Sequence, residues 1–177
     1  MPGAAIGDHG YDRAMSRIPT LGPRGEGWLL LQVVFMVAIP VAAWQASLAT
    51  IDEGPEIRLG RQIGWLILIG ALALIFGSSA VLRGRNAFSA LPRPIETGSL
   101  VEAGPYRLIR HPIYSGLILA GIATALIRVS PLVAMLTLAL AVVLDLKRRR
   151  EEAWLTERYP GYGAYRERTK ALVPFLY

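Results

Sequence analysis

The sequence predicts an all-α integral membrane protein with about four transmembrane helices. The last two helices form a tight hairpin, and a cytoplasmic amphipathic C-terminal segment follows them. Of the 177 residues, 53% are hydrophobic and 18% are charged, against roughly 45–50% and about 25% in globular domains. The apolar residues gather in four runs. The basic residues are concentrated in alternate segments between these runs, which is the pattern of a chain that crosses a membrane repeatedly.

The four runs are taken in chain order. Residues 28–48 and 63–82 contain no charged side chain, and each is about as long as a helix that crosses a hydrocarbon core roughly 30 Å thick. Residues 112–127 and 131–146 are shorter runs, and runs of this length can also be re-entrant. Only three residues separate them, so the two helices are expected to be antiparallel. A soluble protein with very hydrophobic helices is the alternative, but such helices normally keep a polar face.

The distribution of basic residues predicts the orientation. If all four segments cross, residues 1–27, 83–111 and 147–177 share one side of the membrane, and they hold 16 of the 19 Lys and Arg residues. The positive-inside rule then places both termini in the cytoplasm. The net charge of +6 favours an anionic membrane surface over nucleic acid as partner. Residues 1–27 are expected to form a mobile cytoplasmic segment.

Several kinds of site are excluded by composition. The chain has no cysteine and only two histidines, His9 and His111. A cysteine nucleophile and a multi-histidine metal centre are therefore excluded, and no metal site is predicted. The glycine-rich, P-loop, HExxH and GxSxG motifs of soluble enzymes are also absent from the sequence. A cofactor site in this chain would have to be of another kind.

Chemistry-bearing residues collect from about residue 97 onward. His111 precedes a proline, which biases it toward extended backbone, and Pro112 suits the first position of a helix. Arg110 and His111 are therefore expected at the cytoplasmic mouth of the third helix, where free backbone N–H groups attract anions. The alternative interpretation is that Arg110 is only a topology charge and Tyr114 an interfacial aromatic residue.

A second cluster lies at the end of the fourth run. On a continuous helix Lys147 and Glu151 lie one turn apart, as do Arg148 and Glu152, and such pairs are typical of an exposed helix. Residues 148–150 are three consecutive arginines, for which binding of lipid headgroups is the default expectation. The hairpin would place this cluster on the same side of the membrane as Arg110 and His111.

These residues together resemble a known family, the isoprenylcysteine carboxyl methyltransferases, which belong to a wider group with the phospholipid N-methyltransferases. The resemblance covers about residues 97–177, and residues 28–96 are similar only in forming two membrane helices and the start of a cytoplasmic loop. The matching motifs, in order, are Gly104-x-Tyr106, Arg110-His111-Pro112-x-Tyr114-x-Gly116, Glu151-Glu152-x-x-Leu155, Tyr162-x-x-Tyr165 and Pro174. The chain departs from the family at Tyr159-Pro160, where Phe-Gly is common, and at Lys147, where an arginine is often found.

The resemblance implies an integral membrane enzyme that takes S-adenosylmethionine from the cytosol and a lipophilic or prenylated substrate from the bilayer. Residues 97–177 would then be the catalytic region, with the active site at the cytoplasmic face. The implied cofactor-binding residues are Tyr106, Arg110, His111, Tyr114, Gly116, Glu151, Glu152 and Tyr162. The implied catalytic residues are Lys147, Glu151 and Glu152. His111 and the adjacent helix start would hold the cofactor carboxylate, and a glutamate would bind its ribose hydroxyls or amino group.

The methyl acceptor is left open by the sequence. A carboxylate acceptor is already ionised at neutral pH and needs no general base, so carboxyl O-methylation is the default prediction. A phospholipid amine or a small thiol is also conceivable, and an amine would need a base, which a glutamate can supply. Two alternatives remain: an NADPH-dependent membrane reductase, and a non-catalytic membrane protein whose basic tail binds anionic lipid. The oligomeric state is not predicted.

Overall fold

The computed structural model describes residues 18–48, 54–85, 87, 91 and 100–174. Within these residues the chain forms five α-helices and one short 3₁₀ helix, and no strand. In chain order they are α2 (Glu26–Ser47), α3 (Pro55–Gly84), η1 (Gly104–Arg107), α4 (Pro112–Arg128), α5 (Pro131–Arg158) and α6 (Tyr162–Arg168). The predicted all-α class is confirmed for this part of the chain. Most of the predicted mobile segment, residues 1–27, lies outside the described residues, as do residues 97–99 at the start of the predicted catalytic region.

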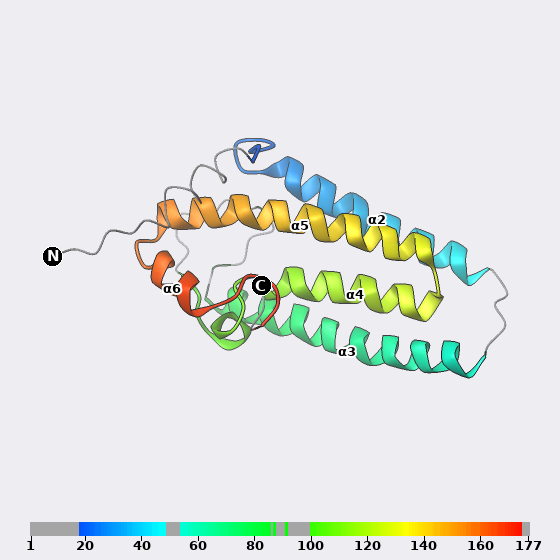
Figure 1. Cartoon of the computed structure of the whole chain (residues 1–177). Helices are drawn as coiled ribbons and strands as arrows, with labels where there is room; N and C mark the ends of the chain where they lie inside the picture. The colour runs from blue at the N-terminus through cyan, green and yellow to red at the C-terminus, as the bar shows by residue number, and fades with distance from the viewer. Residues whose placement is uncertain (1–17, 49–53, 86, 88–90, 92–99, 175–177) are drawn as a thin grey trace.

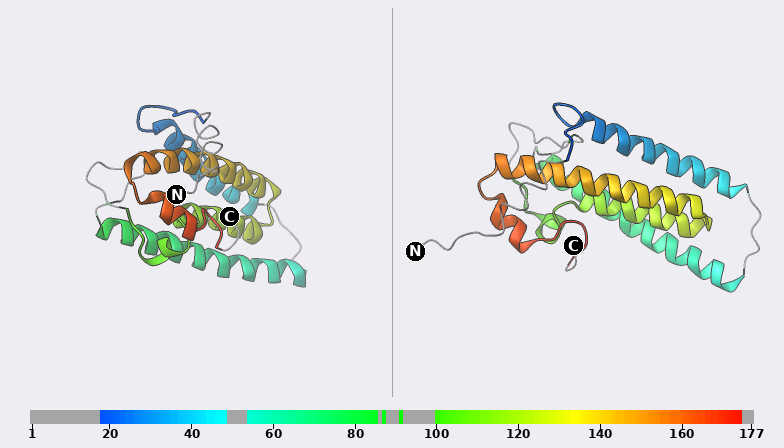
Figure 2. Two further views of the ribbon diagram at one scale, coloured as in Figure 1. Left: turned by 60° about the vertical axis from the view of Figure 1, so that its left-hand side comes forward. Right: turned by 45° about the horizontal axis from the view of Figure 1, so that its top comes forward.

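The four long helices lie alongside one another (Figure 1). The α4 helix packs against α3 on one side and α5 on the other, and α2 packs mainly against α5. The end of α3, the start of α4 and the end of α5 lie at one end of this bundle, and η1 and α6 gather there (Figures 1 and 2). Segments far apart in sequence are thereby brought together at that end.

Local sequence explains where the helices begin and end. Pro55, Pro112 and Pro131 occupy the first turns of α3, α4 and α5, where the missing N–H is no loss. Val129 ends α4 in the left-handed conformation, with φ +50°, which is uncommon for a β-branched residue. Ser130 then caps α5, because its Oγ accepts a hydrogen bond of 3.3 Å from the Val133 backbone N–H.

Two helices extend beyond the predicted apolar runs. The α3 helix begins at Pro55, eight residues before the run predicted at 63, and the α5 helix continues twelve residues past 146 to Arg158. The added turn of α3 carries Arg61, whose Nε donates to the Ile127 carbonyl oxygen at 3.1 Å. This arginine, predicted only as a loop charge, therefore satisfies a carbonyl at the end of α4.

Two helices, α2 and α3, are long and apolar enough to cross a membrane, and few of their residues are buried. The core helix of a soluble protein would be mostly buried, whereas these helices expose large apolar side chains. The α4 helix is apolar but shorter. The most exposed apolar side chains of α2, α3 and α5 are Leu30, Trp44, Leu66, Ile69, Phe76, Met135 and Leu138. This exposure favours a membrane location.

Small residues let the helices approach closely. A Cβ added at Gly64 of α3 would lie 2.8 Å from Ile127 Cγ1 and 3.0 Å from the Ala123 carbonyl oxygen of α4. A Cβ at Gly121 of α4 would lie 2.6 Å from the Thr137 side chain of α5. These contacts hold α4 tightly between its two neighbours.

Candidate active site

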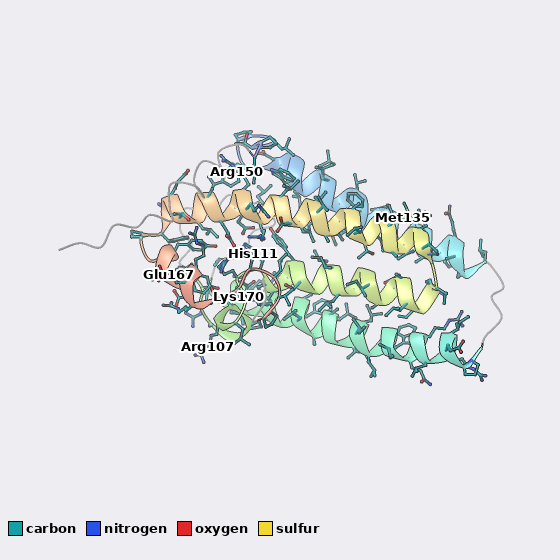
Figure 3. All side chains as sticks on the ribbon, viewed as in Figure 1. Arg107, His111, Met135, Arg150, Glu167 and Lys170 are labelled. Atoms are coloured by element: carbon teal, nitrogen blue, oxygen red, sulfur yellow. The ribbon has the colours of Figure 1, made fainter. Side chains whose placement is uncertain are left out.

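The residues that the sequence singled out meet at one end of the bundle. Arg110 and His111 lie in the segment just before α4, the two glutamates lie on α5, and the tail that contains α6 closes the third side. Figure 3 shows His111 close to Lys170 and near α5, whereas Met135 lies toward the opposite end of that helix. The arrangement places the charged residues at one end of a bundle whose other surfaces are largely apolar.

Glu152 lies at the centre of this cluster. It is 0% exposed, and its Oε1 accepts hydrogen bonds from Arg110 Nε at 2.9 Å and lies 3.1 Å from His111 Nε2. Burial by itself would raise the pKa of Glu152, but the hydrogen bond and charge of His111 and the charge of Arg110 outweigh it and hold the pKa well below 4.5. Glu152 is therefore a permanent buried anion that fixes Arg110 and His111.

Arg110 also holds the C-terminal tail. Its Nη1 donates to the Thr169 carbonyl oxygen at 2.6 Å and to the Arg166 carbonyl oxygen at 3.2 Å, at the end of α6. Next to it the backbones pair in parallel, with the Arg110 N–H donating to the Lys170 carbonyl at 2.8 Å and the His111 N–H to the Ala171 carbonyl at 3.0 Å. The tail is thus fastened across the start of α4.

His111 stacks on Tyr114, with 5.3 Å between ring centroids and an angle of 10° between the planes. The Tyr114 hydroxyl donates to Glu151 Oε2 at 2.7 Å, and His111 Nδ1 lies 3.8 Å from the same oxygen. The two glutamates therefore have different surroundings. Glu152 is fully buried between basic groups, whereas Glu151 is partly exposed and faces the stacked rings.

The structure corrects the predicted exposure of the end of α5. Lys147 and Glu152 are 1% and 0% exposed, so this face of the helix is buried and not solvated. Lys147 Nζ lies 5.2 Å from the centroid of the Tyr114 ring and donates to Gln32 Oε1 at 2.6 Å. A residue of α2 contacts Lys147, and the segment before α4 contacts Glu152; the local charge pattern could indicate neither contact.

The basic run at 148–150 is also placed differently from the prediction. Arg148 is buried and pairs with Asp145 Oδ1 at 2.7 Å and with Glu152 Oε2 at 3.7 Å. Arg149 is more exposed and pairs with Asp145 as well. Arg148 therefore belongs to the buried cluster, because every fourth residue of a helix returns to the same face. Burial leaves Arg148 little access to a lipid headgroup, and lipid binding by the rest of the run stays a prediction.

Three tyrosines line the side of the cluster formed by η1 and α6. The Tyr165 hydroxyl donates to the Tyr106 carbonyl oxygen at 2.7 Å, which joins α6 to η1. Tyr162 packs edge-on against Tyr165 and is 1% exposed. Its buried hydroxyl has no hydrogen-bond partner among the residues that the structure describes. Burial raises the pKa of all three phenols, so each remains protonated and able to donate. An unpaired buried hydroxyl is costly.

Gly116 lies in a helix contact. A Cβ at this position would lie 2.5 Å from Ile75 Cγ1 and 3.1 Å from the Ala71 carbonyl oxygen of α3. The structure thus gives Gly116 a packing role between α3 and α4, and contact with a cofactor stays a prediction. The other predicted site residues, Tyr106, Arg110, His111, Tyr114, Lys147, Glu151, Glu152 and Tyr162, all gather around the start of α4 and the end of α5.

Three residues of this region were not predicted from sequence. Ser115 donates to the Leu172 carbonyl oxygen at 2.5 Å and so adds to the fastening of the tail. Thr169 accepts from Arg110 through its carbonyl, which no sequence pattern indicates. Gln32 did carry a signal, since it is a polar residue inside the first apolar run, and such residues usually have a functional or pairing role.

The match to a family model decides what kind of protein carries this cluster. The model of the phospholipid methyltransferases matches residues 61–161, which is more than half of the chain. This chain belongs to the phospholipid methyltransferase family. The resemblance predicted from the motifs is thereby confirmed at the level of this wider group. The matched residues include all of α4 and α5 and all but the first six residues of α3, and exclude α2 and α6.

One curated relative is the cobalt-zinc-cadmium resistance protein CzcN of Cupriavidus metallidurans. It is 34% identical to this chain over 85 residues. The match covers 46% of this chain and 38% of the relative's own length. The likeness is therefore to part of that protein.

Proposed function

We propose that this chain is an S-adenosylmethionine-dependent membrane methyltransferase that transfers a methyl group to a lipophilic acceptor at the cytoplasmic face. Carboxyl O-methylation of an isoprenylcysteine-like acceptor is the default, and methylation of a phospholipid amine is the second candidate. The observation that carries the proposal is the buried cluster around His111, Tyr114 and Glu152 in a chain of the phospholipid methyltransferase family. Family membership favours methyl transfer over an NADPH-dependent reductase or a non-catalytic lipid-binding protein.

The residues present fit S-adenosylmethionine. Of the two glutamates, Glu151 is the better supported partner for the ribose hydroxyls or the amino group, because Arg110 and His111 already bind Glu152. The backbone N–H groups at the start of α4, next to His111, would hold the carboxylate. The unpaired Tyr162 hydroxyl would donate to a polar atom of the cofactor. When bound, the cofactor supplies a sulfonium methyl group, which needs an aligned nucleophile and little further catalysis.

Positioning is the contribution that the chain's own residues would make to catalysis. An aligned nucleophile is worth effective molarities on the order of 10⁵–10⁸ M. The Lys147 ammonium, buried above Tyr114, would orient an acidic acceptor. A carboxylate acceptor needs no proton removed. An amine acceptor would have to lose one, and the partly exposed Glu151 is the carboxylate better able to take it.

The proposed topology has four crossings, by α2, α3, α4 and the first half of α5, with α4 and α5 as a hairpin and both termini cytoplasmic. Support comes from the excess of Lys and Arg in residues 83–111 and 147–177. The site would then lie at the cytoplasmic face, open to a cofactor from the cytosol and to a substrate from the bilayer. The metal-resistance role in the name of CzcN is not extended to this chain, because the match covers 38% of that protein.

Calorimetry of S-adenosylmethionine binding to the purified protein in detergent tests the proposal. We expect micromolar binding by the wild type. His111→Ala and Glu151→Gln should each weaken it by about tenfold or more, whereas Glu157→Gln, at an exposed position on the same helix, should bind as the wild type does. Circular dichroism would check that each variant is folded. No binding by a folded wild type would overturn the proposal, and NADPH and anionic lipid would be tested next.

A further inference from the structure

Gln32 is a polar residue of α2 that apolar packing does not explain. All the remaining residues between Trp28 and Trp44 are apolar or aromatic. The α2 helix is also one of the two candidate membrane spans. A polar amide in such a helix is costly unless it is paired. The helix also lies outside residues 61–161, which the family model matches.

The partner of Gln32 is a buried cation of the candidate site. Gln32 Oε1 accepts a hydrogen bond of 2.6 Å from Lys147 Nζ, across 115 residues of sequence. Lys147 is 1% exposed, and its ammonium lies over the ring of Tyr114 at 5.2 Å from the centroid. The Tyr114 hydroxyl in turn donates to Glu151 at 2.7 Å. Gln32 is therefore connected through Lys147 to the stacked ring of Tyr114 and, through Tyr114, to Glu151.

The packing between α2 and α5 holds Gln32 in place. Farther along the two helices, Ile39 and Ala43 of α2 belong to one buried core with Leu140 and Leu144 of α5. A lysine side chain has four rotatable bonds and ends in a compact point charge with no fixed direction. A hydrogen bond to an acceptor on a packed neighbouring helix restricts that freedom.

We propose that Gln32 is a positioning residue that directs the Lys147 ammonium toward the methyl acceptor, so that α2 contributes to acceptor recognition. The inference rests on the proposed function. It assigns Gln32 no contact with the cofactor, because the Gln32 side chain hydrogen-bonds to Lys147 and Met36. The expected signature is a change in the KM for the acceptor without a change in the Kd for S-adenosylmethionine.

The test is a double-mutant cycle with Gln32→Met and Lys147→Met, both close in size to the native residues. The assay follows methyl transfer from labelled S-adenosylmethionine to N-acetyl-S-farnesyl-L-cysteine, and calorimetry gives the Kd for the cofactor. Gln32→Met should raise the KM by about tenfold, equivalent to about 1.4 kcal/mol, and should add nothing when Lys147 is already methionine. Gln45→Met, at an exposed position on the same helix, is the matched control and should leave KM and Kd unchanged.

The outcomes separate this inference from the function on which it rests. A Gln32→Met variant with the KM of the Gln45→Met control would overturn the inference, as would equal losses in the Kd for the cofactor and the KM for the acceptor. A Gln32→Met effect that persists in full in the Lys147→Met background would also overturn it. If the wild type binds the cofactor but does not methylate the probe, the assigned acceptor and this inference both fail. If the wild type does not bind the cofactor, the proposed function itself fails.

Discussion

Replacing Glu152 by glutamine should destabilise the folded protein strongly. The substitution keeps the size of the side chain and removes a charge that is 0% exposed. Its Oε1 lies 2.9 Å from Arg110 Nε, and its Oε2 lies 3.7 Å from Arg148 Nη1. Both arginine side chains are at least nine-tenths buried. The variant therefore leaves two buried cations without their shared anion.

The expected magnitude follows from this geometry. Removing one partner of a buried ion pair costs about 3–5 kcal/mol, because the remaining charge stays desolvated. In a protein of this size each kcal/mol lowers the melting temperature by about 2–4 °C. Glu152→Gln should therefore melt about 6–20 °C below the wild type. The Asp145 carboxylate, 2.7 Å from Arg148, compensates one of the cations in part, so the lower half of this range is expected.

Thermal unfolding in detergent, followed by intrinsic tryptophan fluorescence at one scan rate, measures this change. Glu157→Gln is the matched control, because Glu157 is exposed on the same helix, and it should stay within about 2 °C of the wild type. If Glu152→Gln melts together with the Glu157→Gln control, Glu152 does not hold the cluster together. The assignment of Glu152 as a structural anion would then be wrong.

Three further predictions test other parts of the structure. Tyr162→Phe should leave the melting temperature unchanged or slightly higher, since it removes a buried hydroxyl without a partner among the described residues. The same variant should weaken S-adenosylmethionine binding. A lower melting temperature with unchanged binding would show that the hydroxyl is structural. Gly64→Ala should lower the free energy of unfolding by about 1–3 kcal/mol, because the added Cβ would press on α4. Gly70→Ala should not, because a Cβ added there would meet no neighbouring side chain or helix within 4 Å among the described residues. Because the folded-state pKa of Glu152 is held below 4.5, its stabilisation is complete above that pH and lost as the pH falls further. Unfolding measured from pH 6 downward should show this acid loss in the wild type and a smaller loss in Glu152→Gln.

Much of the fold was readable from local sequence. The bounds of α2 and α4 agree with the predicted runs at 28–48 and 112–127 to within two residues, because hydropathy and a proline at the helix start act over short distances. The start of α3 and the end of α5 lie outside the predicted apolar runs, because the outer turns of these two helices are polar. Those turns are stabilised by contacts such as that of Arg61 with the end of α4.

The candidate site was predicted as a set of residues but not as an arrangement. The motif segments supplied His111, Tyr114 and the two glutamates, and the structure brings them together. The charge pattern of α5 was misleading for Lys147, because pairs one turn apart look the same on an exposed and a buried face. Burial of Lys147 depends on a contact with α2 that the sequence does not indicate.

The sequence by itself determined the helical class, the apolar character and the residue types of the site, since these depend on composition and on spacing of a few residues. Only the tertiary structure decided that Glu152 is shared by Arg110 and His111, 42 and 41 residues away. The same holds for the fastening of the tail by Arg110 and for the pairing of Lys147 with Gln32 across 115 residues. The physical reason is that such contacts depend on which helix faces meet. Close approach at Gly64 and Gly121 sets how α3, α4 and α5 meet.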